Sequence, residues 1–300
     1  MKKFVAVFVL VSVAVGFFVL NVSAGVFDDL LAWTKQAPHL LAPRGNGFFP
    51  SDLVLEEPER EVSTPSPLRI FQPASPPSAF LSAQGVFQWT NVHRQQAGLQ
   101  VLLRNALLDE IEQSKVEDMF ARQYFEHVSP LGEGISHVAE EFGYEFLAIG
   151  ENLALGNYAS DQALVQAWMD SPGHRANILG ISYSEIGIAV QRGQFQGNTT
   201  WLAVQVFGRP LSECDFPDEA LKALIAWEKV QLEELALELE RLRGDMEAHR
   251  PKFGPAYNRK VTEYNALVDQ YNALAAQVQA DIATYNLQAQ AFNACIKTPS

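Results

Sequence analysis

The sequence has little positive charge, and this shortage excludes a class of partner. Its 300 residues hold 22 Lys and Arg against 35 Asp and Glu, a formal net charge of −13. A nucleic-acid-binding face needs clustered cations that release the counterions of phosphates. The composition therefore argues against nucleic acid as a partner and disfavours acidic membrane lipids.

The short motifs that mark common hydrolases are also missing. The chain contains no HExxH zinc motif and no G-x-S-x-G nucleophile elbow. Ser171, three residues before His174, is a candidate nucleophile with Glu151 as the orienting acid. Because Pro172 follows it directly, Ser171 fits a helix terminator better than a nucleophile.

Long apolar runs are absent except at the N-terminus. Lys2 and Lys3 precede an apolar stretch from Phe4 to Leu20 and a small-residue site after Ala24. This order predicts an export signal over residues 1–26. Cleavage and retention as a transmembrane anchor both remain open, and either places the rest of the chain outside the cytoplasm.

Residues 27–82 are proline-rich, with nine of the sixteen prolines of the chain and no sustained hydrophobic period. Proline fixes φ and removes a backbone donor. We therefore expect an extended linker with one short contact, "DDLLAW", near its start.

Residues 83–212 change to helical periods followed by strand-like runs. "GVFQWTNVHRQQAGL" places Val86, Trp89 and Val92 on one helix face, and "NALLDEIEQSKVEDMFARQYF" continues as a helix of about five turns. "DQALVQAWM" follows Ser160 as an N-cap. "EIGIAVQ" and "TWLAVQVFG" then predict an antiparallel hairpin. The segment is thus predicted to be one α+β domain.

Residues 213–300 carry two heptad stripes around "RPKFGP". They predict an antiparallel coiled-coil hairpin whose first helix stops near His249 and whose arms are roughly 45 to 60 Å long. The two cysteines, Cys214 and Cys295, flank it. An even number of cysteines in an exported chain indicates a disulfide, and a bridge here would close the hairpin. The stripes are Ile225, Leu232, Leu235, Leu239, Leu242 and Met246, with Glu228 as the break, and Tyr257, Val261, Tyr264, Val268, Tyr271, Ala275, Val278, Ile282, Tyr285, Ala289, Phe292 and Ile296.

Cations gather near the predicted tip of this hairpin, on an otherwise acidic chain. An anionic partner and an ordinary solvated helix surface both explain them. The six are Arg241, Arg243, Arg250, Lys252, Arg259 and Lys260.

Three polar clusters in residues 83–212 stand at Gly- or Pro-marked breaks, where side chains project into clefts. "YFEHVSP" holds His127 at the expected end of the second helix. "IGENLALG" holds Glu151 and Asn152, where Glu151 would interrupt or start a strand. "SPGHRANIL" holds His174 at the start of a short helix. Two imidazoles and a carboxylate can bind zinc or a similar divalent cation, but their separation in sequence makes the signal weak.

The order of "TNVHRQQAGL", "DMFARQYFEHVSPLG", "GYEFLAIGENLALG", "AWMDSPGHRANILGISYSEIGIAV" and "WLAVQVFGRP" resembles the CAP superfamily of cysteine-rich secretory proteins, antigen 5 and pathogenesis-related 1, in its bacterial SCP-like form. The resemblance covers about residues 84–210. It implies an α-β-α sandwich with a cleft lined by His127, Glu151 and His174, and framework roles for Arg175, Asn177 and Leu179.

One family position is unmatched. The second glutamate that eukaryotic members carry shortly after the tryptophan of the third helix is absent here, because Met169, Asp170 and Ser171 follow Trp168. Asp170 or Glu185 would have to replace it in a four-ligand metal site.

Family members differ in activity, so the fold alone does not determine function. We expect an exported or surface-anchored binding module whose partner is a ligand of the cell envelope or an extracellular ligand, protein or lipid. The alternatives are a hydrolase that uses a divalent metal such as zinc with His127, Glu151 and His174, and a lipid-binding protein.

Overall fold

The computed structural model describes residues 54–70 and 80–298. They fall into two compact units. The sheet unit holds Val54–Phe216 and the last helical turns from Ala289, and the hairpin unit holds Pro217–Gln288. The predicted export signal and "DDLLAW" lie outside the described residues. Among the residues described, no helix combines the length and apolarity needed to cross a membrane.

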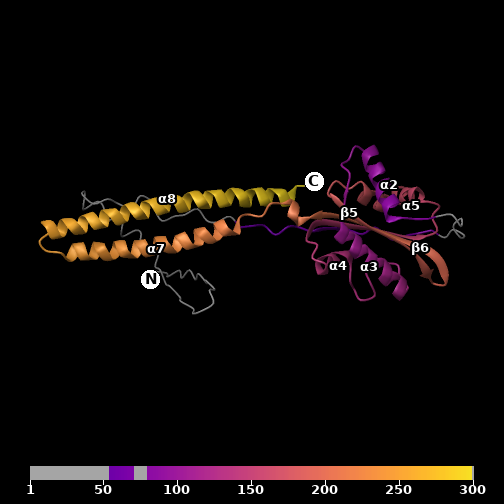
Figure 1. The fold of residues 1–300 in the computed structure, drawn as a ribbon, viewed down its shortest axis with the longest axis horizontal. Coiled ribbons are helices and arrows are strands. Elements are labelled where there is room, and N and C mark those ends of the chain that lie inside the picture. Colours follow the sequence, from indigo (N-terminus) through magenta and orange to yellow (C-terminus); the bar gives the residue numbers. More distant parts are fainter. Residues whose placement is uncertain (1–53, 71–79, 299–300) are drawn as a thin grey trace, which may run out of the picture. The chain divides into compact units, whose positions relative to one another are not determined.

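Three long strands form the centre of the sheet unit (Figure 1). β4 (Phe146–Gly156) and β5 (Glu185–Phe195) each pair antiparallel with β6 (Asn198–Pro210), and β3 (Leu103–Arg104) adds to β5 in parallel. The predicted hairpin is therefore confirmed. Its strands are longer than expected, because the turn is only Gln196 and Gly197, both with positive φ.

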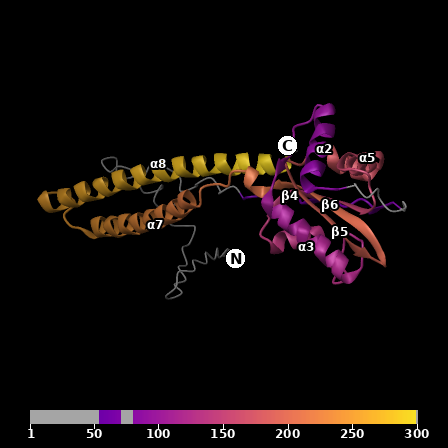
Figure 2. The same ribbon diagram turned by 45° about the vertical axis from the view of Figure 1, so that its right-hand side comes forward.

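Helices cover both faces of this sheet (Figures 1 and 2), which confirms the α+β class and the α-β-α sandwich. α2 (Ala83–Gln96), α5 (Asp161–Asp170) and α6 (Pro172–Ile178) lie on one face, over a core centred on the fully buried Trp168. α3 (Ala106–Arg122) and α4 (Ile135–Glu141) lie on the other. α5 begins at Ser160, whose side chain accepts from the Ala163 amide as predicted.

The inward face of α2 differs from the prediction. Val86 is buried as predicted and Trp89 packs partly buried against the core, but the fully buried line of the helix continues through Thr90 and Arg94 instead of Val92. A charged residue is tolerated at such a position only when its donors are satisfied. The Arg94 guanidinium donates to the carbonyls of Gln100, Ile178 and Gly180, at 2.7 to 2.9 Å, and so ties α2 to the end of α6.

The described part of the proline-rich segment is not an extended linker. β1 (Glu61–Ser63) pairs in parallel with residues 148–150 of β4, and β2 (Leu68–Arg69) pairs in parallel with residues 154–155. We call residues 61–69 the strap. The linker prediction fails here because the edge of β4 supplies backbone partners that no local sequence pattern reveals.

The hairpin unit contains α7 (Glu219–Ala248) and most of α8 (Pro255–Lys297). α7 ends at the predicted residue, His249, and the described heptad stripe of α8 is buried from Tyr264 to Phe292. On α7, Ala236 is buried in place of the predicted Leu235, and Glu228 lies in the seam. The predicted coiled-coil helices are thus present.

The predicted disulfide is confirmed. Cys214 and Cys295 are bonded, with their Cα atoms 5.7 Å apart, and both belong to the sheet unit. They pack with Leu147, Leu211 and Phe292, so the end of α8 is joined to the sheet unit both covalently and by apolar contact.

Candidate functional site

His127 and Glu151, predicted from separate motifs, are in direct contact. Glu151 lies in the middle of β4, not at a break in it, and is fully buried. His127 lies in the loop after α3, which ends five residues earlier than predicted, at Arg122. His127 Nδ1 is 2.5 Å from Glu151 Oε2. The two residues form one charged or hydrogen-bonded pair at the edge of the sheet.

Lys115 completes this pair from α3. Its Nζ lies 3.5 Å from Glu151 Oε1 and also donates to the His127 carbonyl. The Lys115 side chain is 5% exposed and that of Glu151 is 0% exposed. Buried charges persist only when they are paired and hydrogen-bonded. Lys115 therefore compensates the Glu151 carboxylate and fixes the loop that carries His127.

Glu112 lies one turn before Lys115 on the same buried side of α3. Neither of its carboxyl oxygens has a hydrogen-bond partner. Burial first, and then the negative charge of Glu151, raise the pKa of Glu112 well above its ordinary value, against a smaller lowering by Lys115. Glu112 thus keeps its proton to a higher pH than an exposed carboxyl group does.

His174 approaches the same region from α6 and is 1% exposed. Its Nδ1 lies 2.8 Å from the Ser171 hydroxyl oxygen. Burial, followed by the charge of His127, lowers the pKa of His174 to about 4, so its imidazole is neutral near pH 7. His174 Nε2 is buried and has no hydrogen-bond partner. Glu151 is hydrogen-bonded to His127 instead, so a Ser171–His174–Glu151 triad is not assembled.

Amide side chains tie α6 to β4 behind the histidines. Asn177 Nδ2 donates to Asn152 Oδ1 at 3.0 Å, and Asn152 Nδ2 donates to the His174 carbonyl at 3.2 Å and to Gln205 Oε1 at 3.4 Å. Gln205 donates in turn to Thr90 Oγ1 at 2.6 Å. This buried chain of hydrogen bonds fixes the backbone at His174 and gives Asn177 the framework role that was predicted for it.

A divalent cation does not fit this arrangement of His127. Its Nδ1 faces Glu151 and its Nε2 faces the Pro65 carbonyl oxygen, 2.5 Å away. A ligating histidine needs one nitrogen lone pair directed at the metal. Two acceptors flank this ring, so both contacts are hydrogen bonds only in the imidazolium form.

Nor does any cluster of at least three His, Cys, Asp or Glu side chains within residues 54–70 and 80–298 have a metal-binding arrangement. The metal set of His127, Glu151 and His174 is not assembled in this structure, and stays a prediction.

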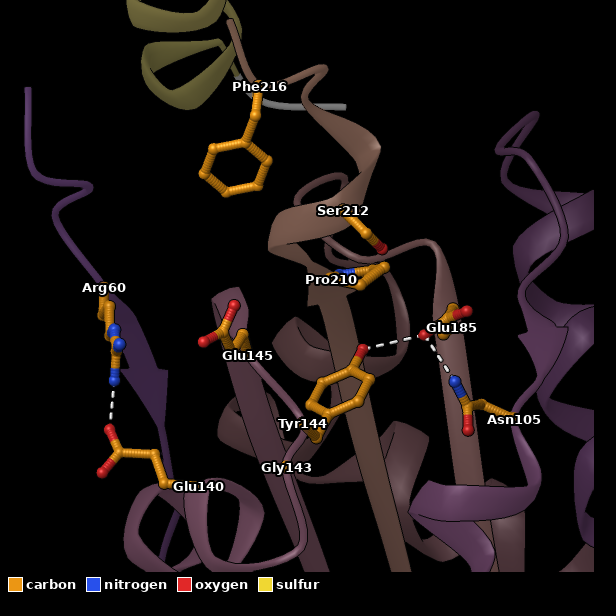
Figure 3. A pocket seen from close by; sticks show the side chains of 10 residues that line it. All are labelled: Arg60, Asn105, Glu140, Gly143, Tyr144, Glu145, Glu185, Pro210, Ser212 and Phe216. Carbon is orange, nitrogen blue, oxygen red and sulfur yellow. Dashed lines mark hydrogen bonds and ion pairs between the residues drawn. The ribbon is translucent and has the colours of Figure 1, made fainter. Parts of the chain in front are cut away.

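Neither proposed replacement for the missing glutamate joins the histidines. Asp170 is exposed and accepts from Gln166 on its own helix. Glu185 accepts from the Tyr144 hydroxyl and from Asn105 Nδ2, both at 2.9 Å, in a separate pocket of about 440 Å³ (Figure 3). Burial and the Glu185 charge raise the Tyr144 pKa. Glu185 therefore belongs to this pocket and not to the group around His127.

Sequence reasoning missed Glu112, Lys115 and the Pro65 carbonyl. A signal existed for the first two, because they share the spacing of the apolar side of α3 with Leu108 and Met119, where charged residues are out of place. Nothing in the sequence pattern places Pro65 at His127, because that contact depends on where the strap pairs with β4.

The sheet covered by helices on both faces, with two histidines and a buried glutamate at one edge, defines an α-β-α sandwich of the CAP type. Residues 87–207 match the family model described as "CAP: Cysteine-rich secretory protein family". The match to the CAP family thus covers this domain and not the rest of the chain.

Two curated relatives match part of the chain. The uncharacterized protein YkwD of Bacillus subtilis (strain 168) is 32% identical over 128 residues, which is 43% of this chain and 48% of YkwD. The uncharacterized membrane protein YlbC of the same organism is 29% identical over 170 residues, 57% of this chain and 44% of YlbC. The chain thus aligns with about half the length of these relatives.

Solved structures show the same partial likeness. An extracellular protein containing a SCP domain from Bacillus anthracis str. Ames is 26% identical, with a TM-score of 0.37 over 42% of this chain and 40% of that one. An outer surface protein from Borrelia burgdorferi is 19% identical, with a TM-score of 0.38 over 42% of this chain and 91% of that one.

Proposed function

We propose that this protein is an extracytoplasmic binding module whose cleft, formed by His127, Glu151 and His174, recognises a ligand of the cell envelope. One observation carries the proposal. His174 Nε2 is a buried hydrogen-bonding atom without a partner, beside charged groups that neutralise one another. An unsatisfied buried polar atom costs about 1 to 3 kcal/mol, which a ligand that bonds to it recovers.

Hydrolysis has less support from the same geometry. A neutral His174 with a pKa of about 4 is a weak general base near pH 7, and the carboxylate of Glu151 is hydrogen-bonded to the other histidine. Titration of the protein with micromolar zinc tests the metal-dependent alternative. Zinc binding that is lost in His127→Ala would support the hydrolase and contradict the assignment made above.

The extracytoplasmic location is supported by the predicted export signal and by the Cys214–Cys295 disulfide, because disulfides persist in oxidising compartments. The description of the related proteins as extracellular or outer-surface molecules agrees with it. Anchoring of this chain through residues 1–26 remains part of the proposal.

Some of the cations near the hairpin tip already interact with groups of their own segment. Arg241 pairs with Glu238 and Asp245 on its own helix, and Arg250 donates to the carbonyls of Glu247 and His249. We therefore place ligand recognition in the cleft.

This function can be tested by measuring how much material from cell-envelope fractions the purified, immobilised protein retains. His174→Phe removes the unpartnered nitrogen while keeping a ring, and we expect it to reduce retention at least fivefold. His137→Phe is the matched control, because His137 is half exposed on α4 and contacts only Glu141 through an ion pair. Equal retention by the wild-type protein and the folded His174→Phe variant would contradict a cleft ligand.

A further inference from the structure

The strap pairs with the edge of β4, and only Leu68 of the strap packs against the main core of the sheet unit. It precedes the family-matched residues 87–207, and each strap residue is half-buried or exposed, whereas every residue of β4 is buried. Val62 of the strap, for example, is 48% exposed. Its two pairings with β4 involve only three and two residues. Removing it would uncover the edge of β4 and the part of the core against which Leu68 packs.

The pairing is interrupted opposite the candidate site. Ser63 pairs with Gly150 and Leu68 with Ala154, so four strap residues span the length of three β4 residues. The β4 carbonyls in this interval have side-chain partners instead: Asn177 Nδ2 donates to the Glu151 carbonyl at 3.4 Å, and Trp168 Nε1 to that of Leu153 at 3.2 Å. The cleft is therefore a break in strand pairing, with fixed donors along it.

The cleft holds the strap through its backbone. His127 Nε2 contacts the Pro65 carbonyl oxygen, and Asn177 Nδ2 donates to the Ser63 carbonyl at 3.3 Å. Backbone carbonyls are present in every peptide, so these contacts suit an extended chain of varied sequence.

One contact selects a side chain. Pro65 packs against Gly173, where an added Cβ would lie 2.6 Å from the Pro65 Cβ. Gly173 is the second residue of α6, directly before His174, so the proline ring occupies a space that exists only because residue 173 has no side chain. A proline also donates no backbone hydrogen bond, which suits a position where strand pairing is interrupted.

From these contacts we propose that the cleft binds an extended, proline-containing peptide segment as a strand added to β4, and that residues 61–69 are its intramolecular occupant. His127 binds the carbonyl of the proline, Gly173 accommodates the proline ring, and β4 pairs with the flanking residues. An external peptide of this kind must displace the strap before it binds. This inference rests on the proposed function and names the class of ligand.

The test uses the full chain and a labelled peptide, EVSTPSPLR, that reproduces residues 61–69. A strap variant carries Pro65→Gly and Leu68→Asp, which remove the packing on Gly173 and the contact of Leu68 with the sheet unit's core. We expect fluorescence anisotropy to show at least tenfold tighter peptide binding by the strap variant than by the wild-type chain, because the intramolecular competitor is weakened.

Two further variants locate the peptide. In the strap-variant background, His127→Phe should weaken peptide binding at least tenfold, and His137→Phe should leave it unchanged. A scrambled peptide of the same composition should bind at least tenfold more weakly. A folded strap variant that does not bind EVSTPSPLR, or binds the scrambled peptide equally well, would overturn the inference.

Hydrogen exchange of the wild-type chain keeps the inference testable if the strap variant does not fold. Amides of residues 61–63 and 68–70 that exchange at least tenfold faster than those of β6 would support a strap that detaches locally. Exchange as slow as that of β6 would overturn it.

The two proposals fail differently. A folded strap variant that does not bind the peptide, but still retains envelope fractions in a way that depends on His174, would refute the peptide as the class of ligand. The proposal of a binding module would then remain. Loss of both activities would refute both.

Discussion

Replacing Lys115 by methionine tests the electrostatic design of the site. Methionine keeps most of the length and apolar surface of the side chain, so the change removes a charge and opens only a small cavity. The Glu151 carboxylate, 0% exposed, then retains only its contact with His127. Removing one partner of a buried ion pair costs up to about 3 to 5 kcal/mol, because the remaining charge, here in contact with His127 alone, is less well compensated. We expect a loss of this size in the free energy of unfolding at pH 7.

Glu112→Gln is the matched control on the same helix. Glu112 is as deeply buried as Glu151, but burial raises its pKa and favours the neutral carboxyl group, which a neutral amide resembles in charge and size. The expected loss is therefore within about 1 kcal/mol, since near-isosteric exchange without a change of charge is tolerated.

Urea titration followed by tryptophan fluorescence measures both variants. A background with Trp33→Phe and Trp227→Phe leaves three tryptophans, Trp89, Trp168 and Trp201, and all three belong to the sheet unit. In this background, a decrease in the free energy of unfolding below about 1 kcal/mol for Lys115→Met would refute the role of Lys115 in compensating Glu151. An equal decrease for Glu112→Gln would refute it as well. Adding Glu151→Gln to Lys115→Met should recover part of the loss, because it removes the uncompensated charge.

Three other predictions concern pH, the disulfide and packing. The pKa of His174 is lowered from about 6.5 in the unfolded chain to about 4 in the folded one, so acid favours unfolding between these values. Between pH 7 and pH 4.5, the free energy of unfolding measured by urea titration should fall by about 2 kcal/mol more in the wild-type protein than in His174→Gln. Equal falls in the two proteins would contradict a buried neutral imidazole. Replacing Cys214 and Cys295 by alanine opens a loop with a sequence separation of 81 and should lower the free energy of unfolding by on the order of 4 kcal/mol. An unchanged midpoint of urea unfolding would argue against loop closure as the source of this stability. Gly187→Ala places a Cβ 2.3 Å from the backbone of α3 and should destabilise the protein by about 1 to 3 kcal/mol. Gly244→Ala, with open space around it on α7, should stabilise the protein by up to about 1 kcal/mol. Melting temperatures that shift in the same direction in both variants would contradict the packing described.

Much of the fold was accessible from the sequence, because the signals are local. The Ser160 cap, the apolar period of α5 and the heptad stripe of α8 involve residues a few positions apart, and all were located correctly. The disulfide followed from two cysteines at the ends of a predicted hairpin. Where a polar residue interrupts such a period, as Arg94 does in α2, the prediction failed, since two of its carbonyl partners, Ile178 and Gly180, lie 84 and 86 residues away.

The central residues of the candidate site could be predicted from the sequence, but their contacts could not. Sequence motifs alone singled out His127, Glu151 and His174, because they stand in unusual polar clusters within a family-like order. The pairing of Glu151 with His127 rather than His174, and its compensation by Lys115, depend on which face of β4 meets α3. The position of Pro65 at His127 depends on the register of the strap on the β4 edge. Periodicity along the chain determines which residues are buried, but only the pairing of distant strands and helices decides which buried atoms meet.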